Sequence, residues 1–280
     1  MTVRVKANAK LNLTLSVNGI QNGYHMLDSL VCTVDLYDLI VLKKRKDDFV
    51  TVEMHGLGTE LMPFEDNNAA KAAQSYIQAF NTKGADIKIF KNIPLGAGMG
   101  GSSADAAGVI RGMGMLYGTG SERQLKELCD GLGSDTGYML SGGYARLSGR
   151  GEKVAPINCK TRLNFLLLVP KAGVSTAECY KRYDDCPTIL PSSDEAVEAL
   201  ISGDKERFGK LLSNALYVPA TTINPEVRKA FEDLQSFSPL GVNMTGSGSG
   251  VYAIFDTPEL CAWAKSRYRG KCECLQLKTV

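Results

Sequence analysis

Apolar and polar residues alternate without a break over the first seventeen positions of the chain. From Val3 to Val17 the odd positions carry valine, alanine or leucine, and the even positions carry polar or charged residues. Because successive side chains of a β-strand point to opposite faces, this pattern predicts a half-buried strand. A turn in residues 18–25 and apolar runs at 30–34, 39–42 and 50–54 predict further strands.

The apolar repeat then lengthens to that of a helix. Between residues 69 and 80 the apolar side chains share one helical face, and Asp66 or Asn67 is the candidate N-cap. The elements expected next are a strand at 85–90, helices at 102–117 and 121–129, a strand at 144–147, a strand at 165–169, helices at 176–183, 195–201, 205–214 and 225–237, strands at 241–244 and 251–255, a helix at 258–268 and a strand at 273–277.

These elements do not follow a strict strand–helix–strand rhythm, so we expect two α+β layers rather than a doubly wound sheet. The segment "NCKTR" separates two blocks of elements, which favours a boundary near residues 155–162. We therefore expect two domains, 1–158 and 159–280. The chain shows no internal repeat.

Composition narrows the class of protein. The 280 residues carry a net charge of +2 and 44% hydrophobic residues, as expected of a soluble globular protein. No block of like charge indicates nucleic acid or an anionic membrane as partner, so a small ligand is expected. The eight cysteines form no CxxC pair, and beside only two histidines the close pair Cys272 and Cys274 does not indicate structural zinc. We expect reduced thiols, no signal peptide and a cytoplasmic location.

The stretch "PLGAGMGGSSADAAG", Pro94 to Gly108, contains five glycines ahead of a run of helix formers. Without Cβ atoms such a loop can present backbone N–H groups to an anion, and the helix beginning at Ser102 adds the positive end of its dipole. Phosphate is therefore the expected ligand. The alternative to phosphate binding is a turn that needs glycine only for tight packing.

Two common phosphate motifs fit this stretch poorly. The pattern GxxxxGK[ST] needs a lysine after its last glycine, whereas Gly101 is followed by serine. The pattern GxGxxG matches at Gly96, Gly98 and Gly101, but a dinucleotide fold needs a strand running directly into the first glycine. Pro94 interrupts that approach, and the residues after the loop remain helical where an acidic strand end is required.

"PLGAGMGGSS" resembles the ATP-binding motif of the GHMP kinase superfamily, and "NMTGSGSGVYAIF" (243–255) resembles its C-terminal glycine motif. The resemblance implies an α+β two-domain GHMP kinase fold, with a ribosomal-protein-S5-domain-2-like ATP-binding domain at 1–158 and a ferredoxin-like α+β domain at 159–280. It also implies ATP, with Mg²⁺ carried on it, as cofactor. The implied ATP-binding residues are Pro94, Leu95, Gly96, Ala97, Gly98, Met99, Gly100, Gly101, Ser102 and Ser103, with the two serine hydroxyls reaching phosphate or Mg²⁺. The implied supporting loop comprises Thr245, Gly246, Ser247 and Gly248.

The segment from Ala9 to Asp38 is similar to one branch of that superfamily, in which the pattern K-x-N-L-x-L is followed by G-Y-H-x-L and D-L-x-D. The similarity continues at 65–67, 132–135, 173–180 and 213–217. It implies ATP-dependent phosphorylation of the 2-hydroxyl of 4-diphosphocytidyl-2-C-methyl-D-erythritol, in the non-mevalonate route to isoprenoid precursors. Phosphorylation of another small alcohol, of homoserine or mevalonate type, and ligand binding without turnover are the alternatives. As partners we expect this small molecule but no nucleic acid or membrane, and the chain to be a monomer or homodimer.

The resemblance implies that Asp135 accepts the proton of the substrate hydroxyl and that Lys10 holds this aspartate and the incoming charge. Lys10 and Asn12 lie two residues apart on the polar face of the first strand, so both can reach one ligand. Without the resemblance, such a pair would most often belong to a solvated sheet face, and Asp135 would be a turn or capping residue.

Aromatic residues are the candidates for a nucleobase site. Tyr24 offers a ring for stacking, and the adjacent His25 can hydrogen-bond the edge of a base. Tyr180 is a second aromatic candidate. These three residues, with Asn12, form the expected substrate site.

The chain departs from the family pattern after Asp135. The family usually has a short apolar residue and a proline there, whereas this chain has Thr136 and Gly137. This difference predicts a looser loop around Asp135, which would lower the rate without changing the chemistry. Neither a histidine nor a carboxylate pair marks the Mg²⁺ ligands in the sequence.

Overall fold

The computed structural model describes residues 1–56 and 67–280, which form two compact units that interleave along the chain. Unit 1 comprises Met1–Ala9, Leu36–Pro94 and Gly100–Gly142, and unit 2 comprises Lys10–Asp35, Leu95–Met99 and Gly143–Val280. Strands β1 (Thr2–Asn12) and β3 (Tyr24–Lys44) contribute residues to both units. The domain limits expected from the sequence, 1–158 and 159–280, stay a prediction.

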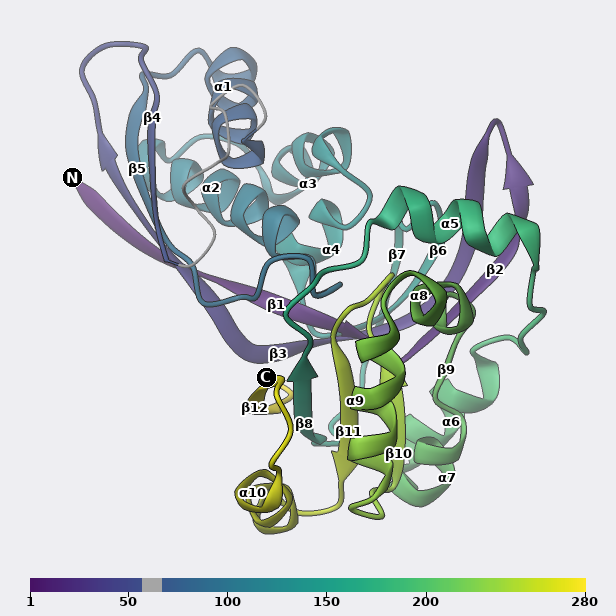
Figure 1. Cartoon of the computed structure of the whole chain (residues 1–280). Coiled ribbons are helices and arrows are strands. Elements are labelled where there is room, and N and C mark those ends of the chain that lie inside the picture. The colour runs from purple at the N-terminus through teal and green to yellow at the C-terminus, as the bar shows by residue number, and fades with distance from the viewer. Residues whose placement is uncertain (57–66) are drawn as a thin grey trace. The chain divides into compact units, whose positions relative to one another are not determined.

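The described part of unit 1 combines a sheet with four helices (Figure 1). The second half of β3 pairs antiparallel with β5 (Ala85–Phe90), which pairs parallel with β4 (Thr51–His55). The helices are α1 (Asn68–Phe80), α2 (Gly101–Tyr117), α3 (Glu122–Leu132) and α4 (Thr136–Ser141).

Helix α2 packs closely on this sheet. A Cβ on Gly108 would lie 2.5 Å from Ile40 Cδ1 and 3.1 Å from Ala7 Cβ, so a larger residue at this position would require these neighbours to shift. Short side chains throughout the first half of α2 serve the same approach, since Ala104, Ala106 and Ala107 are all buried. The helix that begins in the glycine-rich stretch is thereby fixed to the core of unit 1.

Unit 2 contains two groups of strands. In the first, β2 (Thr14–Gln21) and β6 (Tyr144–Gly149) pair antiparallel with the first half of β3, β7 (Lys153–Ile157) pairs with β6, and β9 (Ser213–Asn214) pairs parallel with β2. The second is an antiparallel sheet in the order β10 (Gly241–Met244), β11 (Val251–Phe255), β8 (Asn164–Val169) and β12 (Glu273–Lys278).

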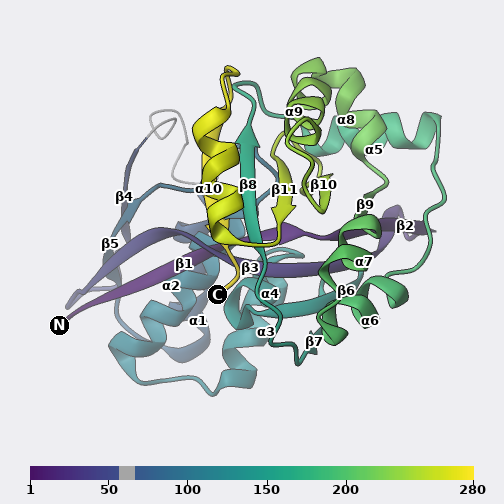
Figure 2. The ribbon, with the colours of Figure 1, turned by 90° about the horizontal axis from the view of Figure 1, so that it is seen from below.

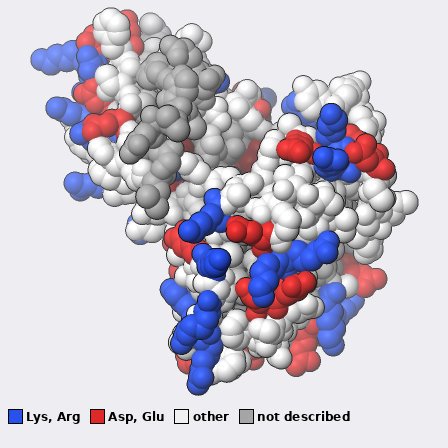
Figure 3. Space-filling view, in the orientation of Figure 1, with Lys and Arg blue, Asp and Glu red and all other residues white. Residues whose placement is uncertain are grey.

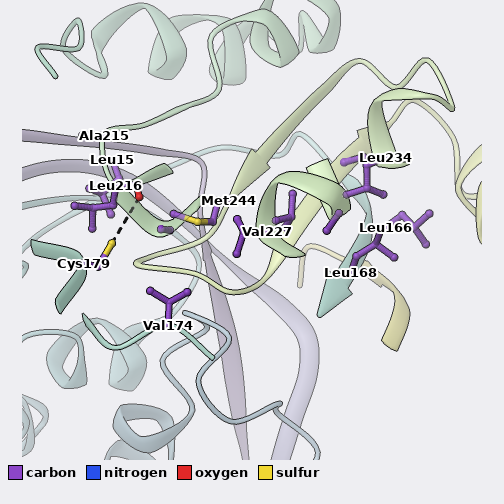
Figure 4. Packing of buried hydrophobic residues seen from close by; sticks show 14 of the residues in the cluster. Leu15, Leu166, Leu168, Val174, Cys179, Ala215, Leu216, Val227, Leu234 and Met244 are labelled. Carbon is purple, nitrogen blue, oxygen red and sulfur yellow. Dashed lines mark hydrogen bonds between the residues drawn. The ribbon is translucent and has the colours of Figure 1, made fainter. Parts of the chain in front are cut away.

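Six helices complete the described part of unit 2. They are α5 (Thr176–Asp185), α6 (Asp194–Ser202), α7 (Lys205–Lys210), α8 (Tyr217–Ile223), α9 (Pro225–Gln235) and α10 (Pro258–Arg267). Helices α9 and α10 pack against the antiparallel sheet, as Figure 2 shows. The apolar core they enclose includes Leu166, Leu168, Val227 and Leu234, and it extends to Cys179, whose thiol donates a 3.6 Å hydrogen bond to the Leu216 carbonyl (Figure 4).

Most of the expected elements are present, with some changes in extent. The runs at 30–34 and 39–42, expected as separate strands, belong to the single strand β3. The expected turn is confined to Asn22 and Gly23, both with positive φ, because β2 and β3 form a hairpin around them. Asn67 is the N-cap of α1 and accepts the Ala69 N–H at 2.9 Å. The other candidate, Asp66, lies outside the described residues together with Glu65.

Four short elements, α4, α8, β7 and β9, were not anticipated, and the expected helix 205–214 ends at Lys210. Basic and acidic side chains are interspersed on the face of each unit that Figure 3 shows, in keeping with the net charge of +2. Within residues 1–56 and 67–280, no helix has the length and apolar character needed to cross a lipid bilayer.

Candidate active site

The polar face of β1 carries two of the expected site residues in unit 2. Lys10 and Asn12 are 4% and 5% exposed, and the Lys10 ammonium donates to Asn12 Oδ1. Asn12 Nδ2 in turn donates to Ser29 Oγ at 2.8 Å. The face that alternation alone would assign to solvent is therefore buried here, and its polar groups hydrogen-bond to one another.

Residues 95–99 of the glycine-rich stretch also belong to unit 2, where they contact the second glycine loop, residues 245–250. Ser249 N–H donates to the Gly96 carbonyl at 3.0 Å, and Gly250 N–H donates to the Ala97 carbonyl at 3.2 Å. The buried Thr245 hydroxyl accepts the Asn12 N–H and donates to the Gly98 carbonyl, both at 3.1 Å. The two glycine motifs of the sequence and the end of β1 are thus joined by hydrogen bonds.

Close packing explains part of the glycine content. A Cβ on Gly98 would lie 2.1 Å from the Thr245 carbonyl oxygen, and the residue has φ +72°. Any larger residue at this position would push the two loops apart. Tight packing, the alternative to ligand binding that the sequence leaves open, therefore explains why glycine is required at Gly98, whether or not the loop also binds a ligand.

Side chains from unit 2 brace the second glycine loop. Asn214 Nδ2 donates to the carbonyls of Met244 and Gly246, at 2.7 and 2.9 Å. The Ser247 hydroxyl lies 2.9 Å from that of Thr176, at the first turn of α5. Asn214 and Thr176 belong to residues 213–217 and 173–180, two of the segments in which the sequence resembles the family, and these contacts give both segments a structural position.

The remainder of the glycine-rich stretch begins α2 in unit 1. Gly100 is the N-cap, and the hydroxyl of Ser102 accepts a 2.9 Å hydrogen bond from Asn68 at the start of α1. The first turn of a helix leaves backbone N–H groups without intrahelical partners, and these groups together with the helix dipole attract phosphate. Ser102 and Ser103 lie in this turn.

A buried charge cluster lies under the start of α2. The Lys91 ammonium contacts Asp38 and also contacts Asp105 Oδ2 at 2.6 Å; the three side chains are 3%, 0% and 6% exposed. Asp38 Oδ1 further accepts the N–H groups of Asn92 and Ile93 at 2.6 and 2.9 Å. The cluster therefore ties the segment leading to Pro94 to the first turns of α2.

The second carboxylate of this cluster is incompletely satisfied. Asp105 Oδ1 is buried without a hydrogen-bond partner among the described residues. Burial, and to a lesser extent the charge of Asp38, raise the pKa of Asp105 to about 7 against the opposing effect of Lys91. The pKa of Lys91 is raised, because its two carboxylate partners outweigh the effect of burial.

Asp135 lies in unit 1, at the N-cap of α4. Its carbonyl accepts the Met139 N–H at 3.0 Å, and the Thr136 N–H donates to the Gly133 carbonyl at 3.0 Å. Thr136 and Gly137, which replace the usual family residues, are both buried in the first turn of α4. The segment after Asp135 is thus helical, and its effect on the rate stays a prediction.

The three aromatic candidates lie in unit 2. The rings of His25 and Tyr180 are stacked with centroids 4.5 Å apart, and His25 Nε2 lies 2.7 Å from Asp184 Oδ1. The Tyr24 ring, 55% exposed as a residue, has the Arg150 guanidinium 4.7 Å from its centroid. The stacked pair of His25 and Tyr180 provides the flat surface that a base requires, and the Tyr24 ring carries a cation over its face.

A second ion-pair network in unit 2 was not foreseen from the sequence. The Arg146 guanidinium holds the buried Asp28 carboxylate with two bonds of 2.6 and 3.0 Å and reaches Asp194 at 2.6 Å. Burial alone would raise the pKa of Asp28, but the bonds from Arg146 and the Ser193 N–H lower it. This network fixes the start of α6 to strands β3 and β6.

Hydrogen bonds thus join Asn12 on β1, the first half of the glycine-rich stretch and the second glycine loop, and the aromatic candidates also belong to unit 2. Pro94, the serines of α2 and Asp135 belong to unit 1. Within residues 1–56 and 67–280, no group of three histidine, cysteine or acidic side chains is arranged to hold a metal ion.

Comparison with known proteins identifies the family. The chain matches the model of the GHMP kinases N terminal domain over residues 67–145 and that of the GHMP kinases C terminal over residues 196–263. It is also 36% identical over 256 residues to a 4-diphosphocytidyl-2-C-methyl-D-erythritol kinase of Caldicellulosiruptor saccharolyticus, covering 90% of this chain and 87% of that relative. The chain belongs to the GHMP kinase family.

Solved structures agree with this assignment. A crystal structure of 4-(cytidine 5'-diphospho)-2C-methyl-D-erythritol kinase superposes on this GHMP kinase with a TM-score of 0.80 at 29% identity, over 98% of this chain and 99% of that chain. A homoserine kinase from Cytophaga hutchinsonii superposes with a TM-score of 0.77 over 100% of this chain and 94% of that one, but at 16% identity that likeness shows the fold alone. The predicted α+β GHMP kinase fold is therefore confirmed, and the protein is a kinase that uses ATP as phosphoryl donor.

Proposed function

We propose that this GHMP kinase transfers the γ-phosphoryl group of ATP to the 2-hydroxyl of 4-diphosphocytidyl-2-C-methyl-D-erythritol, a step of the non-mevalonate route to isoprenoid precursors, in the cytoplasm. Its relatives at 33–36% identity carry the name of that kinase. The observation that carries the proposal is the stacked pair of His25 and Tyr180, since a cytidyl substrate has a base to stack there.

In the proposed reaction Asp135 accepts the proton of the 2-hydroxyl, and the Lys10 ammonium offsets the charge of the incoming phosphoryl group. Phosphoryl transfer needs mainly in-line placement and charge neutralisation, so one base, one cation and a loop of N–H groups suffice. Lys10 is suited to this role because its hydrogen bond to Asn12 holds the ammonium in one orientation within a buried site.

The glycine-rich stretch from Pro94 to Ser103 would bind the phosphates of ATP, and Thr245 to Gly248 would support it. Mg²⁺ would enter with ATP and neutralise phosphate charge. Hydroxyl oxygens suit this hard cation, and the Ser102 hydroxyl, an acceptor toward Asn68, keeps a second lone pair; we assign the ion to Ser102 and Ser103.

Two other functions compete with this proposal. If the substrate were homoserine or a mevalonate-type acid, it would carry no nucleobase to contact Tyr24 and His25. A protein that only binds ligand would have no need of a proton acceptor at Asp135.

The deciding experiment measures ADP release by the purified protein with Mg-ATP. The acceptors compared are the cytidyl diphosphate alcohol, homoserine, mevalonate and phosphomevalonate. We expect turnover with the cytidyl compound alone. Turnover with one of the other alcohols would replace the substrate, and ATP binding without turnover on any acceptor would favour the binding protein.

A further inference from the structure

The ring of His25 is held from two directions in unit 2. Nε2 lies 2.7 Å from Asp184 Oδ1, and one ring face stacks on Tyr180 at an interplanar angle of 30°. Tyr183 meets the ring with its edge, centroids 6.2 Å apart. Within the described residues Nδ1 has no hydrogen-bond partner, so this nitrogen is the polar atom of the ring that remains for a ligand.

The partner of Nε2 decides what Nδ1 can do. An ionised carboxylate only accepts hydrogen bonds, so Asp184 requires a proton on Nε2. A neutral imidazole carries a single ring proton, and Nδ1 is then an acceptor. An acceptor at this place pairs with an amine of the ligand and repels a carbonyl oxygen.

We infer that Asp184 is a positioning residue that sets the base preference of the enzyme through His25. By keeping the proton on Nε2, Asp184 makes Nδ1 an acceptor that fits the exocyclic amine of cytosine and disfavours the carbonyl that uracil carries at the same position. Asp184 itself contacts no substrate in this scheme, and its side chain is 46% exposed. The inference rests on the proposed function, because it assumes that a nucleobase meets His25.

Three substitutions test this role against a general charge effect. Asp184→Lys replaces the acceptor by a donor, which requires Nε2 to accept and moves the proton to Nδ1. The matched control is Asp185→Lys, the same change of charge on the adjacent exposed carboxylate at the end of α5. Asp184→Ala removes the hydrogen-bond partner of Nε2 without introducing a new one. Because Asp184 is half-exposed at the end of a helix, this substitution should leave the protein folded.

The first measurement is the tautomer of His25 by ¹⁵N imidazole NMR. The chain has only two histidines, and His55→Gln assigns the signals. At about pH 8.5, where an ordinary imidazole is neutral, we expect a proton on Nε2 in the parent protein and on Nδ1 in Asp184→Lys. A parent protein with the proton on Nδ1, or an Asp184→Lys variant with an unchanged tautomer, would overturn the inference.

The second measurement compares kcat/KM for the cytidyl alcohol with that for its uridyl analogue. We expect the ratio to fall about 5-fold in Asp184→Ala and at least about 30-fold in Asp184→Lys, and to stay within about twofold in Asp185→Lys. The change should lie mainly in KM. Equal losses in both lysine variants would assign the effect to charge and refute the positioning role. If the parent turns over neither nucleotide compound, the proposed function fails, while the NMR result still decides the tautomer.

Discussion

The buried cluster of Lys91, Asp38 and Asp105 makes the stability of this kinase depend on pH in a way that one substitution should remove. The change is Asp105→Asn. Asparagine has the shape of a protonated aspartic acid and can still accept the Lys91 hydrogen bond that Asp105 Oδ2 accepts at 2.6 Å. It differs from the parent residue only when Asp105 is ionised.

The expected magnitude follows from the pKa of Asp105, which burial raises from its ordinary value of 3.8 to about 7. Between these two values the folded protein holds a proton that the unfolded chain has released, so stability falls as the pH rises through the folded pKa. For a folded pKa near 7, this carboxyl lowers the free energy of unfolding by about 2 kcal/mol between about pH 5.5 and pH 8. The variant lacks this group and should not lose that amount.

The assay is urea denaturation of parent and variant at both pH values, followed by far-UV circular dichroism because the single tryptophan, Trp263, lies in the other unit. We expect equal stability within about 1 kcal/mol at the lower pH and a variant more stable by about 2 kcal/mol at the higher one. All other titratable groups are the same in both proteins, so the difference between them isolates Asp105.

A constant difference between the two proteins across this pH range would refute the reasoning, because it would mean that Asp105 does not titrate there. Asp38→Asn is the control. Asp38 Oδ1 accepts two backbone N–H groups, from Asn92 and Ile93, so its amide variant should be less stable at both pH values.

Three further predictions concern the site and its support. Asp135→Asn should abolish turnover and leave ATP affinity, measured by calorimetry, nearly unchanged; a comparable loss of both would count against its role as base. Thr245→Val should lower the free energy of unfolding by about 1–3 kcal/mol and raise KM for ATP more than it lowers kcat, because the hydroxyl joins Asn12 to Gly98. Thr245→Ser keeps the hydroxyl and should restore both the stability and the KM. Arg146→Met should lower the free energy of unfolding by about 2–3 kcal/mol near neutral pH, since it leaves the buried Asp28 carboxylate without its partner. Because Arg146 lowers the pKa of Asp28, this loss should shrink in acid, where Asp28 is protonated. A series of denaturation curves at decreasing pH would detect the change.

Local patterns in the sequence predicted much of the secondary structure. The alternation from Val3 to Val17 gives β1 and β2, and Asn67 caps α1 as its side chain chemistry suggests. Short elements were missed because they lack a repeat long enough to recognise. Helix α8 contains Pro219 and only seven residues, and β9 has two residues that become a strand only by pairing with β2.

Side-chain networks were harder to foresee than elements. Asp105 stands within a run of alanines, and a charged residue on the buried face of a helix was an available signal for a buried ion pair. No comparable signal exists for Arg146 and Asp28, which lie 118 positions apart and meet only through the register of β3 and β6. Nor could the sequence say which of Asp184 and Asp185 reaches His25.

The glycine-rich stretch shows why a motif identifies a family more surely than it explains each residue. Small side chains were expected because an anion must approach the backbone, yet Gly98 is also constrained by the Thr245 carbonyl, which a Cβ would approach to 2.1 Å. A Gly98→Ala variant would weaken ATP binding whether it blocked the approach of the phosphates or separated the two loops. Its loss of ATP binding would therefore not distinguish the two causes. The Thr245 hydroxyl is the better probe, because it supports the loop through its hydrogen bond to the Gly98 carbonyl. A rise in KM for ATP on its removal would therefore show that loop packing itself contributes to ATP binding.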